Sequence, residues 1–188
     1  MNATPLKQKS WTGAARLCLA CLLLGLATFS GLAQTGTQRE YEIKAAVLFN
    51  VLKYVEWPGN SASTNPVPLQ IGLLGQLPYP HALTVLDGKT IQGRKLVVKP
   101  ISAAEAQSCQ VVYVGASEKS KCPEIISELK GKPILTVSEV DGFAQRGGMV
   151  NLIAEGNRVA MEINRESATQ AGLSISSQLL RVAKVFPR

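Results

Sequence analysis

His81 is the only histidine in the 188-residue chain, and it stands in the proline-rich turn PYPHAL. A zinc site needs several His, Cys or acidic ligands at short spacing, and none stand at ligand spacing from His81. A serine hydrolase of the common α/β type would need a G-x-S-x-G turn, which the chain lacks. We therefore expect His81 to be a solvated loop residue, and we expect no metal, no cofactor and no enzymatic activity.

Two glycine-containing loops, LLGQ and YVGASE, are better placed to bind a ligand. Each directly follows a short apolar run that is typical of a buried strand. In an open α/β sheet, ligands bind outside the carboxyl ends of the strands, where backbone N–H groups can hold a small anion. The alternative is ordinary strand-to-helix turn chemistry. The candidate ligand-binding residues are Gly75, Gln76, Gly115, Ala116 and Ser117.

The N-terminus has the pattern of a secretory signal peptide. Basic residues precede an apolar run at residues 17–27, and the segment closes with the small-residue sequence SGLA. The run is shorter than the ~20 residues that span a bilayer, which disfavours the alternative of an uncleaved membrane anchor. We expect residues 1–33 to be the signal peptide and residues 34–188 to form a single exported domain.

The charge pattern argues against nucleic acid as a partner. The whole chain carries 20 basic and 13 acidic side chains, a formal net charge of +7. Removing Lys7, Lys9 and Arg16 with the signal peptide leaves 17 basic side chains and a charge of +4. The remaining charges alternate along the chain, whereas phosphate binding needs a clustered basic surface.

Two cysteines remain after cleavage, Cys109 and Cys122. Exported proteins meet oxidising conditions, so the pair could form a disulfide that stabilises the fold by about 3 kcal/mol. A short returning loop would have to bring the two Cα atoms within ~7 Å of each other. The alternative, a buried free thiol at Cys109, therefore stays open.

The middle of the chain alternates between helical and strand patterns. Apolar residues at three- to four-residue spacing predict a helix over 40–56, which ends at Pro58. Further helical segments are expected at 80–86 and after Pro123, and strands at 69–75, 94–101, 109–115 and 133–139. This alternation predicts an α/β fold with a largely parallel sheet and helices on both faces.

A β-hairpin is expected next, because the dipeptide Gly156-Asn157 joins two apolar runs. A two-residue turn there places the apolar pairs on one face and an ion pair beside the turn. The expected cross-strand pairs are Glu155–Arg158, Ala154–Val159, Leu152–Met161 and Val150–Ile163. A short helix over 165–171, stopped by Gly172, should follow.

The closing segment, SISSQLLRVAKVF, predicts a C-terminal helix with a wide apolar arc. Such a helix most simply packs across the sheet as a final layer. The alternative leaves part of the arc exposed as a partner surface. The candidate partner-binding residues are Leu173, Ile175, Leu179, Leu180 and Val182.

Taken in order, several segments together resemble the YfiR family of exported proteins. The resemblance covers residues 40–186, nearly all of the expected mature chain. It is carried by YEIKAAVLFNVLKYVEWP, IGLLG, GRKLVV, CQVVYVGASE, ILTVSEVDGFAQRGGMVNLI and VAMEINRESATQAGLSISSQLLRVAKV.

The resemblance implies a periplasmic protein with an α/β sheet that represses a membrane diguanylate cyclase. Repression would come from engaging the periplasmic sensory domain of the cyclase, which restrains cyclic di-GMP synthesis and biofilm formation. Related domains act as extracytoplasmic sensor modules, so a small-ligand sensor is the alternative function. The resemblance also implies a homodimer.

This chain departs from the family in its cysteines. Family members can carry four cysteines in two redox-sensitive disulfides, whereas the expected mature chain has two. Cys109 matches a family cysteine at the start of CQVVYVG. The resemblance therefore does not carry over any redox control that depends on the second bridge.

Overall fold

The computed structural model describes residues 30–59, 67–156 and 158–186. The chain divides into two compact units, Met1–Thr37 and Gln38–Arg188, and the fold below is that of the second unit. Most of the expected signal peptide lies outside the described residues. No helix in the described ranges is long and apolar enough to cross a membrane.

The first helix, α2 (Ser30–Lys53), begins ten residues before the start that the sequence predicts. The apolar periodicity that marks it begins only at Tyr41, so the sequence pattern detects the part of the helix that packs on the core. The other helices are α3 (Pro80–Thr84), α4 (Cys122–Leu129), α5 (Arg165–Gln170) and α6 (Ser177–Leu180), with 3₁₀ turns at Ala103–Ser108 and Ala116–Lys121.

The central sheet confirms the α/β prediction. Its strands are β2 (Leu69–Leu74), β3 (Thr90–Ile91), β4 (Arg94–Ile101), β5 (Val111–Val114), β6 (Leu135–Ser138), β7 (Val150–Glu155), β8 (Arg158–Asn164) and β10 (Lys184–Phe186). Among the described residues they lie in the order β10-β8-β7-β6-β5-β2-β4-β3. Strands β4, β2, β5, β6 and β7 are mutually parallel, β3 runs antiparallel to β4, and β8 runs antiparallel to β7.

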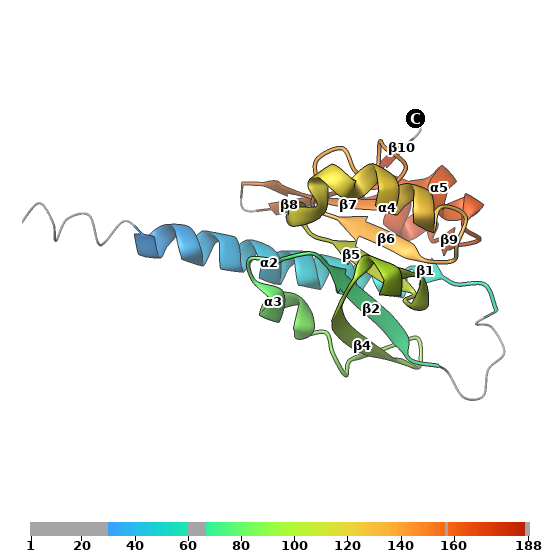
Figure 1. Ribbon diagram of the computed structural model, residues 1–188, viewed down its shortest axis with the longest axis horizontal. Coiled ribbons are helices and arrows are strands. Elements are labelled where there is room, and N and C mark those ends of the chain that lie inside the picture. Colours follow the sequence, from blue (N-terminus) through green and yellow to red (C-terminus); the bar gives the residue numbers. More distant parts are fainter. Residues whose placement is uncertain (1–29, 60–66, 157, 187–188) are drawn as a thin grey trace, which may run out of the picture. The chain divides into compact units, whose positions relative to one another are not determined.

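Helices cover both faces of this sheet, as predicted (Figure 1). Side chains alternate along a strand, so Val111 and Tyr113 of β5 pack with α2 while Val112 and Val114 pack with α4. All four are fully buried. The strands between the two helical layers therefore consist of continuous apolar runs, as expected for a parallel sheet.

The β7–β8 hairpin has the predicted register. Glu155 pairs with Arg158, and the apolar pairs continue from Ala154–Val159 to Val150–Ile163. The Glu155 and Arg158 side chains lie 3.8 Å apart in an exposed ion pair beside the turn. The alternation of apolar residues and the Gly-Asn dipeptide were sufficient to predict the register, because the two strands are adjacent in sequence.

The predicted closing helix is present, but it is much shorter than the apolar segment from which it was predicted. Helix α6 spans only Ser177–Leu180, and Lys184–Phe186 forms strand β10, which pairs in parallel with β8. A second small sheet pairs β9 (Ser174–Ile175) with β1 (Val55–Glu56). Val185 and Phe186 favour a strand because β-branched and aromatic side chains pack well on a sheet, and β8 provides the hydrogen-bonding edge.

Cys109 and Cys122 are free thiols, so the candidate bridge between them is not formed in the structure. Both are buried in the apolar cluster between the sheet and α4. Burial raises the pKa of the Cys122 thiol, which keeps it protonated. The alternative considered for Cys109, a buried free thiol, describes the structure.

Candidate functional site

The strand order defines a topological switch point between β2 and β5. From β2 the chain moves outward to β4, then returns past β2 to β5, β6 and β7. At such a point the loops after the strands diverge, and α/β proteins bind ligands there. Gly75 follows β2 and Gly115 follows β5, so the two predicted ligand loops do meet at this end of the sheet.

These two loops bond to each other. The Gln76 N–H donates to Ser117 Oγ at 2.8 Å, and the Gly115 N–H donates to the Leu74 carbonyl at 2.9 Å. Gly75 has a φ of +88°, and a Cβ there would lie 2.5 Å from Ser117 Oγ. A glycine is therefore required at position 75 both by backbone conformation and by the close contact.

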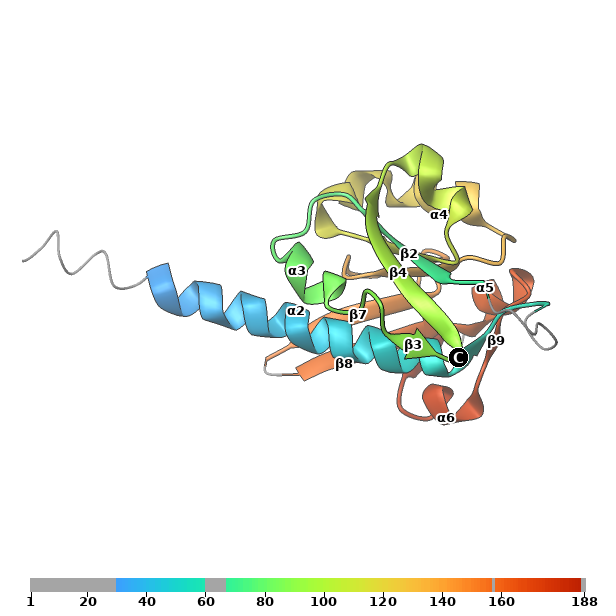
Figure 2. The same cartoon turned by 90° about the horizontal axis from the view of Figure 1, so that it is seen from below.

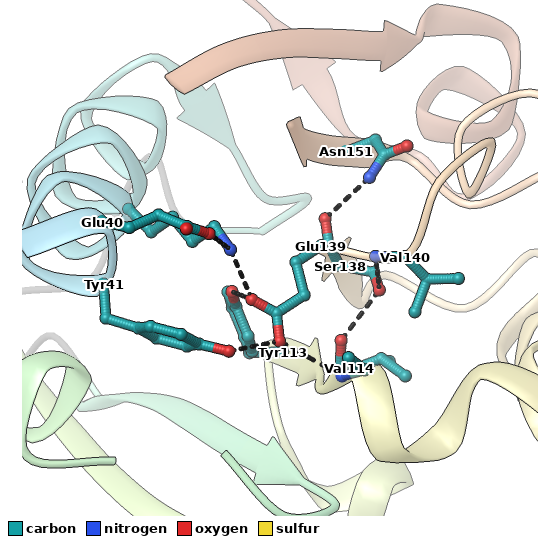
Figure 3. A network of polar contacts seen from close by, with 10 residues as sticks. Glu40, Tyr41, Tyr113, Val114, Ser138, Glu139, Val140 and Asn151 are labelled. Carbon is teal, nitrogen blue, oxygen red and sulfur yellow. Dashed lines mark hydrogen bonds and ion pairs between the residues drawn. The ribbon is translucent and has the colours of Figure 1, made fainter. Parts of the chain in front are cut away.

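A buried carboxylate, Glu139, occupies the same end of the sheet (Figure 3). It directly follows β6, and its side chain is 5% exposed. It accepts hydrogen bonds from Tyr41 Oη at 2.7 Å, Lys44 Nζ at 2.6 Å, Tyr113 Oη at 3.3 Å and the Ala116 N–H at 3.2 Å. We call these five residues the Glu139 network.

The Glu139 network connects α2 to the carboxyl ends of β5 and β6. Lys44 is also ion-paired with Glu40, so the buried ammonium lies between two carboxylates. Burial, with the Glu139 carboxylate as a second cause, raises the pKa of both Tyr41 and Tyr113. Both phenols therefore remain protonated donors, which is what an ionised Glu139 needs.

The polar groups beside Glu139 are also satisfied within the protein. Buried Ser138 Oγ donates to the Val114 carbonyl at 2.8 Å, and Asn151 Nδ2 donates to the Ser138 carbonyl at 3.0 Å (Figure 3). The loop amides expected to hold an anion, Gln76 and Ala116, both have protein acceptors. This end of the sheet is thus built as a closed polar cluster around a carboxylate.

Sequence reasoning missed the Glu139 network. Tyr41 and Lys44 lie 98 and 95 residues from Glu139 in sequence, so no spacing motif connects them. One signal was available, because Glu139 directly follows the buried run LTVS, where a parallel strand ends at the ligand-binding edge.

A second region, which we call the hairpin groove, is lined by residues of α2, the β7–β8 hairpin and the closing segment. Figure 2 shows the backbone of these elements. Its volume is about 730 Å³. Val47 and Val51 line it from α2, and Tyr54 lines it from the turn that directly follows this helix. Residues Val159–Glu162 line it from β8, and Leu179 and Val182 from the closing segment. Val47 and Val51 are four residues apart and so lie on one side of the helix.

The five predicted partner-binding residues differ in accessibility. Leu173 and Leu179 are each 4% exposed and belong to the core, whereas Val182 is 75% exposed. Ile175 and Leu180 are partly buried against that core. Leu179 and Val182 line the hairpin groove, so the structure brings two of the five to a common surface with residues of α2 that the prediction did not include.

Glu162 stands where the hairpin groove meets β10. Its side chain is 6% exposed, and Oε1 lies 2.7 Å from Lys184 Nζ. The buried Oε2 atom accepts no hydrogen bond from any described residue. The pair joins β8 to β10 at registered positions, so β10 is held to the sheet by side chains as well as by its backbone.

Comparison with known families identifies the class of protein. A family model described as YfiR/HmsC-like matches residues 41–184, and the chain therefore belongs to the YfiR/HmsC-like family. The match begins in α2 and ends at the start of β10. Proteins of this family are periplasmic regulators rather than enzymes.

Two solved structures are similar to parts of this chain. One is a conserved domain protein from Vibrio cholerae, with 17% identity and a TM-score of 0.49 over 77% of this chain. The other is an ABC domain in complex with L-Trp from Streptococcus pneumoniae, with 12% identity and a TM-score of 0.46 over 63% of this chain. This chain spans 59% and 55% of those two chains, respectively.

Proposed function

We propose that this protein is a periplasmic negative regulator of a membrane diguanylate cyclase. It binds the periplasmic sensory domain of the cyclase and thereby restrains cyclic di-GMP synthesis and biofilm formation. Membership of the YfiR/HmsC-like family supports the regulatory role. The single structural observation that carries the protein-binding role is the hairpin groove, whose apolar walls include the 75% exposed Val182.

The composition of the groove suits a protein partner. Val182 and Tyr54 are among the exposed large apolar side chains of the described chain, and both line this one groove. Burying one such side chain in an interface contributes on the order of 1–2 kcal/mol. A few buried side chains, with tyrosine among the most frequent, contribute most of the binding energy of an interface, so Tyr54 is the stronger candidate anchor.

Repression requires differential binding. A regulator shifts the cyclase toward its inactive state only if it binds that state more tightly than the active state. Moving the cyclase from mostly active to mostly inactive, 1:99 to 99:1, needs a preference of about 10⁴. A sensory domain whose groove-binding segment is accessible in one state alone would provide such a preference.

The test is cellular. Cyclic di-GMP is measured with the gene, without it, and with a version whose predicted signal peptide is deleted. We expect a rise on deletion that only the exported version reverses, and pull-down of the sensory domain by the purified protein. An unchanged cyclic di-GMP level, together with no association at tens of micromolar, would exclude the proposal.

A second candidate function is a small-ligand sensor at the switch point. A cavity of about 320 Å³ beside Gly75 favours it, with Ser102 and Lys121 also in its lining. The candidate residues Gln76, Gly115, Ala116 and Ser117 form the adjoining loops. A thermal-shift screen of nucleotides and amino acids separates the two functions, because ligand at 100 times Kd stabilises by about 2.7 kcal/mol.

A further inference from the structure

Strand β8 has an edge that is only partly covered. On one side it pairs with β7 from Arg158 to Ile163. On the other side it pairs with β10 only from Glu162 to Asn164. Within the described chain, Arg158–Met161 therefore has no strand partner on its outer edge.

The direction of the backbone groups along this edge follows from one hydrogen bond. The Asn164 N–H donates to the Met149 carbonyl at 2.8 Å, so the backbone groups of Asn164 point toward β7. In an antiparallel pair the direction alternates from one residue to the next. The N–H and C=O of Val159 consequently point away from β7, toward the outer edge.

That outer edge is a wall of the hairpin groove. Four consecutive residues, Val159–Glu162, line the groove. Because side chains alternate between the two faces of a strand, a run of consecutive lining residues marks the edge of the strand rather than one face. Val51 and Leu179 form apolar walls of the same groove, and Val182 is exposed beside them.

The opposite edge of the sheet lacks this arrangement. There β3 pairs only with Arg94 and Lys95 of β4, but the backbone groups that follow have partners or no donor. The Leu96 N–H donates to the Lys89 carbonyl, the Val98 N–H donates to Asp87 Oδ1, and residue 100 is a proline, which blocks the addition of a further strand. The β8 edge instead combines unpaired backbone groups with an adjoining apolar groove. Strand addition uses the same two elements, since main-chain hydrogen bonds give affinity and pockets for alternate side chains give specificity.

We infer that the partner adds an extended segment of about four residues to the β8 edge at Arg158–Met161. The inference rests on the proposed function and takes the segment from the sensory domain of the cyclase. The partner backbone bonds to Val159, and its alternate side chains are apolar and pack against Val51, Leu179 and Val182. The closing strand β10 marks the end of the added strand, because it already pairs with Glu162.

Val159→Pro tests the backbone contact. Proline removes the outward N–H of residue 159 and leaves the hydrogen bonds to β7 in place, as at other edge positions that tolerate proline. The matched control is Val159→Thr, which keeps the N–H and the β-branched shape. We expect at least tenfold weaker binding of the purified sensory domain by Val159→Pro and less than threefold by Val159→Thr, with unchanged circular dichroism.

Hydrogen exchange of the wild-type protein provides a second readout. We expect exchange of the Val159 amide to slow at least tenfold when the sensory domain saturates the protein. Tight binding by Val159→Pro, or wild-type binding without protection of that amide, overturns strand addition and leaves the proposed function standing. Absence of wild-type binding overturns both. If Val159→Pro does not fold, the exchange measurement decides alone.

Discussion

The carboxyl ends of the parallel strands and the hairpin groove differ in whether their side chains and backbone groups have partners within the protein. At the first, Glu139 has four protein donors and the loop amides of Gln76 and Ala116 have protein acceptors. At the second, apolar side chains form much of a groove of about 730 Å³, which Asn50, Gln178 and Lys184 also line, and Val182 remains exposed. The polar groups around Glu139 thus have partners within the protein, while apolar surface remains uncovered at the antiparallel end.

Sheet topology alone therefore does not decide which surface is left open for binding. A switch point offers space and backbone donors, but side chains from α2 satisfy the polar groups here. An apolar groove has no internal substitute for a partner, because only burial removes its surface from water. The variants below test whether the first region is structural and the second is for binding.

The largest effect is expected from Glu139→Ala. This change leaves the Lys44 ammonium buried with one fewer carboxylate and removes the acceptor of two tyrosines. Breaking a buried pair by deleting one partner costs about 3–5 kcal/mol. Urea unfolding should show a loss in this range. The control Glu155→Gln, in the exposed ion pair of the hairpin, should change stability by less than about 0.5 kcal/mol.

Tyr41→Phe should have the next largest effect. It removes a 2.7 Å hydrogen bond to an ionised carboxylate, which costs about 2 kcal/mol near pH 7. A stability loss below about 0.5 kcal/mol would show that this bond does not hold α2 in place.

Alkaline pH should weaken the same cluster. Burial and then Glu139 raise the pKa of Tyr41 and Tyr113, so the folded protein retains phenol protons that the unfolded chain releases at about pH 10. Their contribution is complete below that pH and is lost as the pH rises above it. The free energy of unfolding should fall less steeply above pH 10 in Tyr41→Phe than in wild type. Parallel slopes would contradict this account.

Val182→Asp should weaken binding without unfolding the protein. An exposed charge costs little in the free protein, but it would be buried when the groove is occupied. We expect at least tenfold weaker binding of the sensory domain and a melting temperature within a few degrees of wild type. Val85→Asp is the matched control, since Val85 is also exposed but does not line the groove. Equal losses for both variants would mean that the groove is not the contact.

The smallest effect is expected from Ser117→Ala. It removes the acceptor of the Gln76 N–H in an exposed position, which costs about 0.5–1 kcal/mol. Binding of the sensory domain should not change. If instead a ligand from the screen lost its thermal shift in this variant, the switch point would be a ligand site and the contrast between the two regions would fail.

Local signals predicted most of the fold. Buried apolar runs gave the positions of β2, β4, β5 and β6, and Gly156 with the alternating runs gave the register of β7 and β8. Each of these predictions depends on residues that lie only a few positions apart in the sequence. The closing helix is shorter than predicted for the same reason, because a strand such as β10 exists only where a neighbour offers an edge, and that edge belongs to β8.

The sequence by itself determined the α/β class, the positions of the main strands along the chain, the hairpin register and the resemblance to the YfiR family, since periodicity, turns and ordered motifs are properties of the chain. Tertiary structure alone decided that Tyr41 and Lys44 meet Glu139 and that Val51, Val159 and Val182 line one groove. These contacts join residues separated by many positions. Their formation depends on how helices pack on a sheet, and no local pattern in the sequence records that packing.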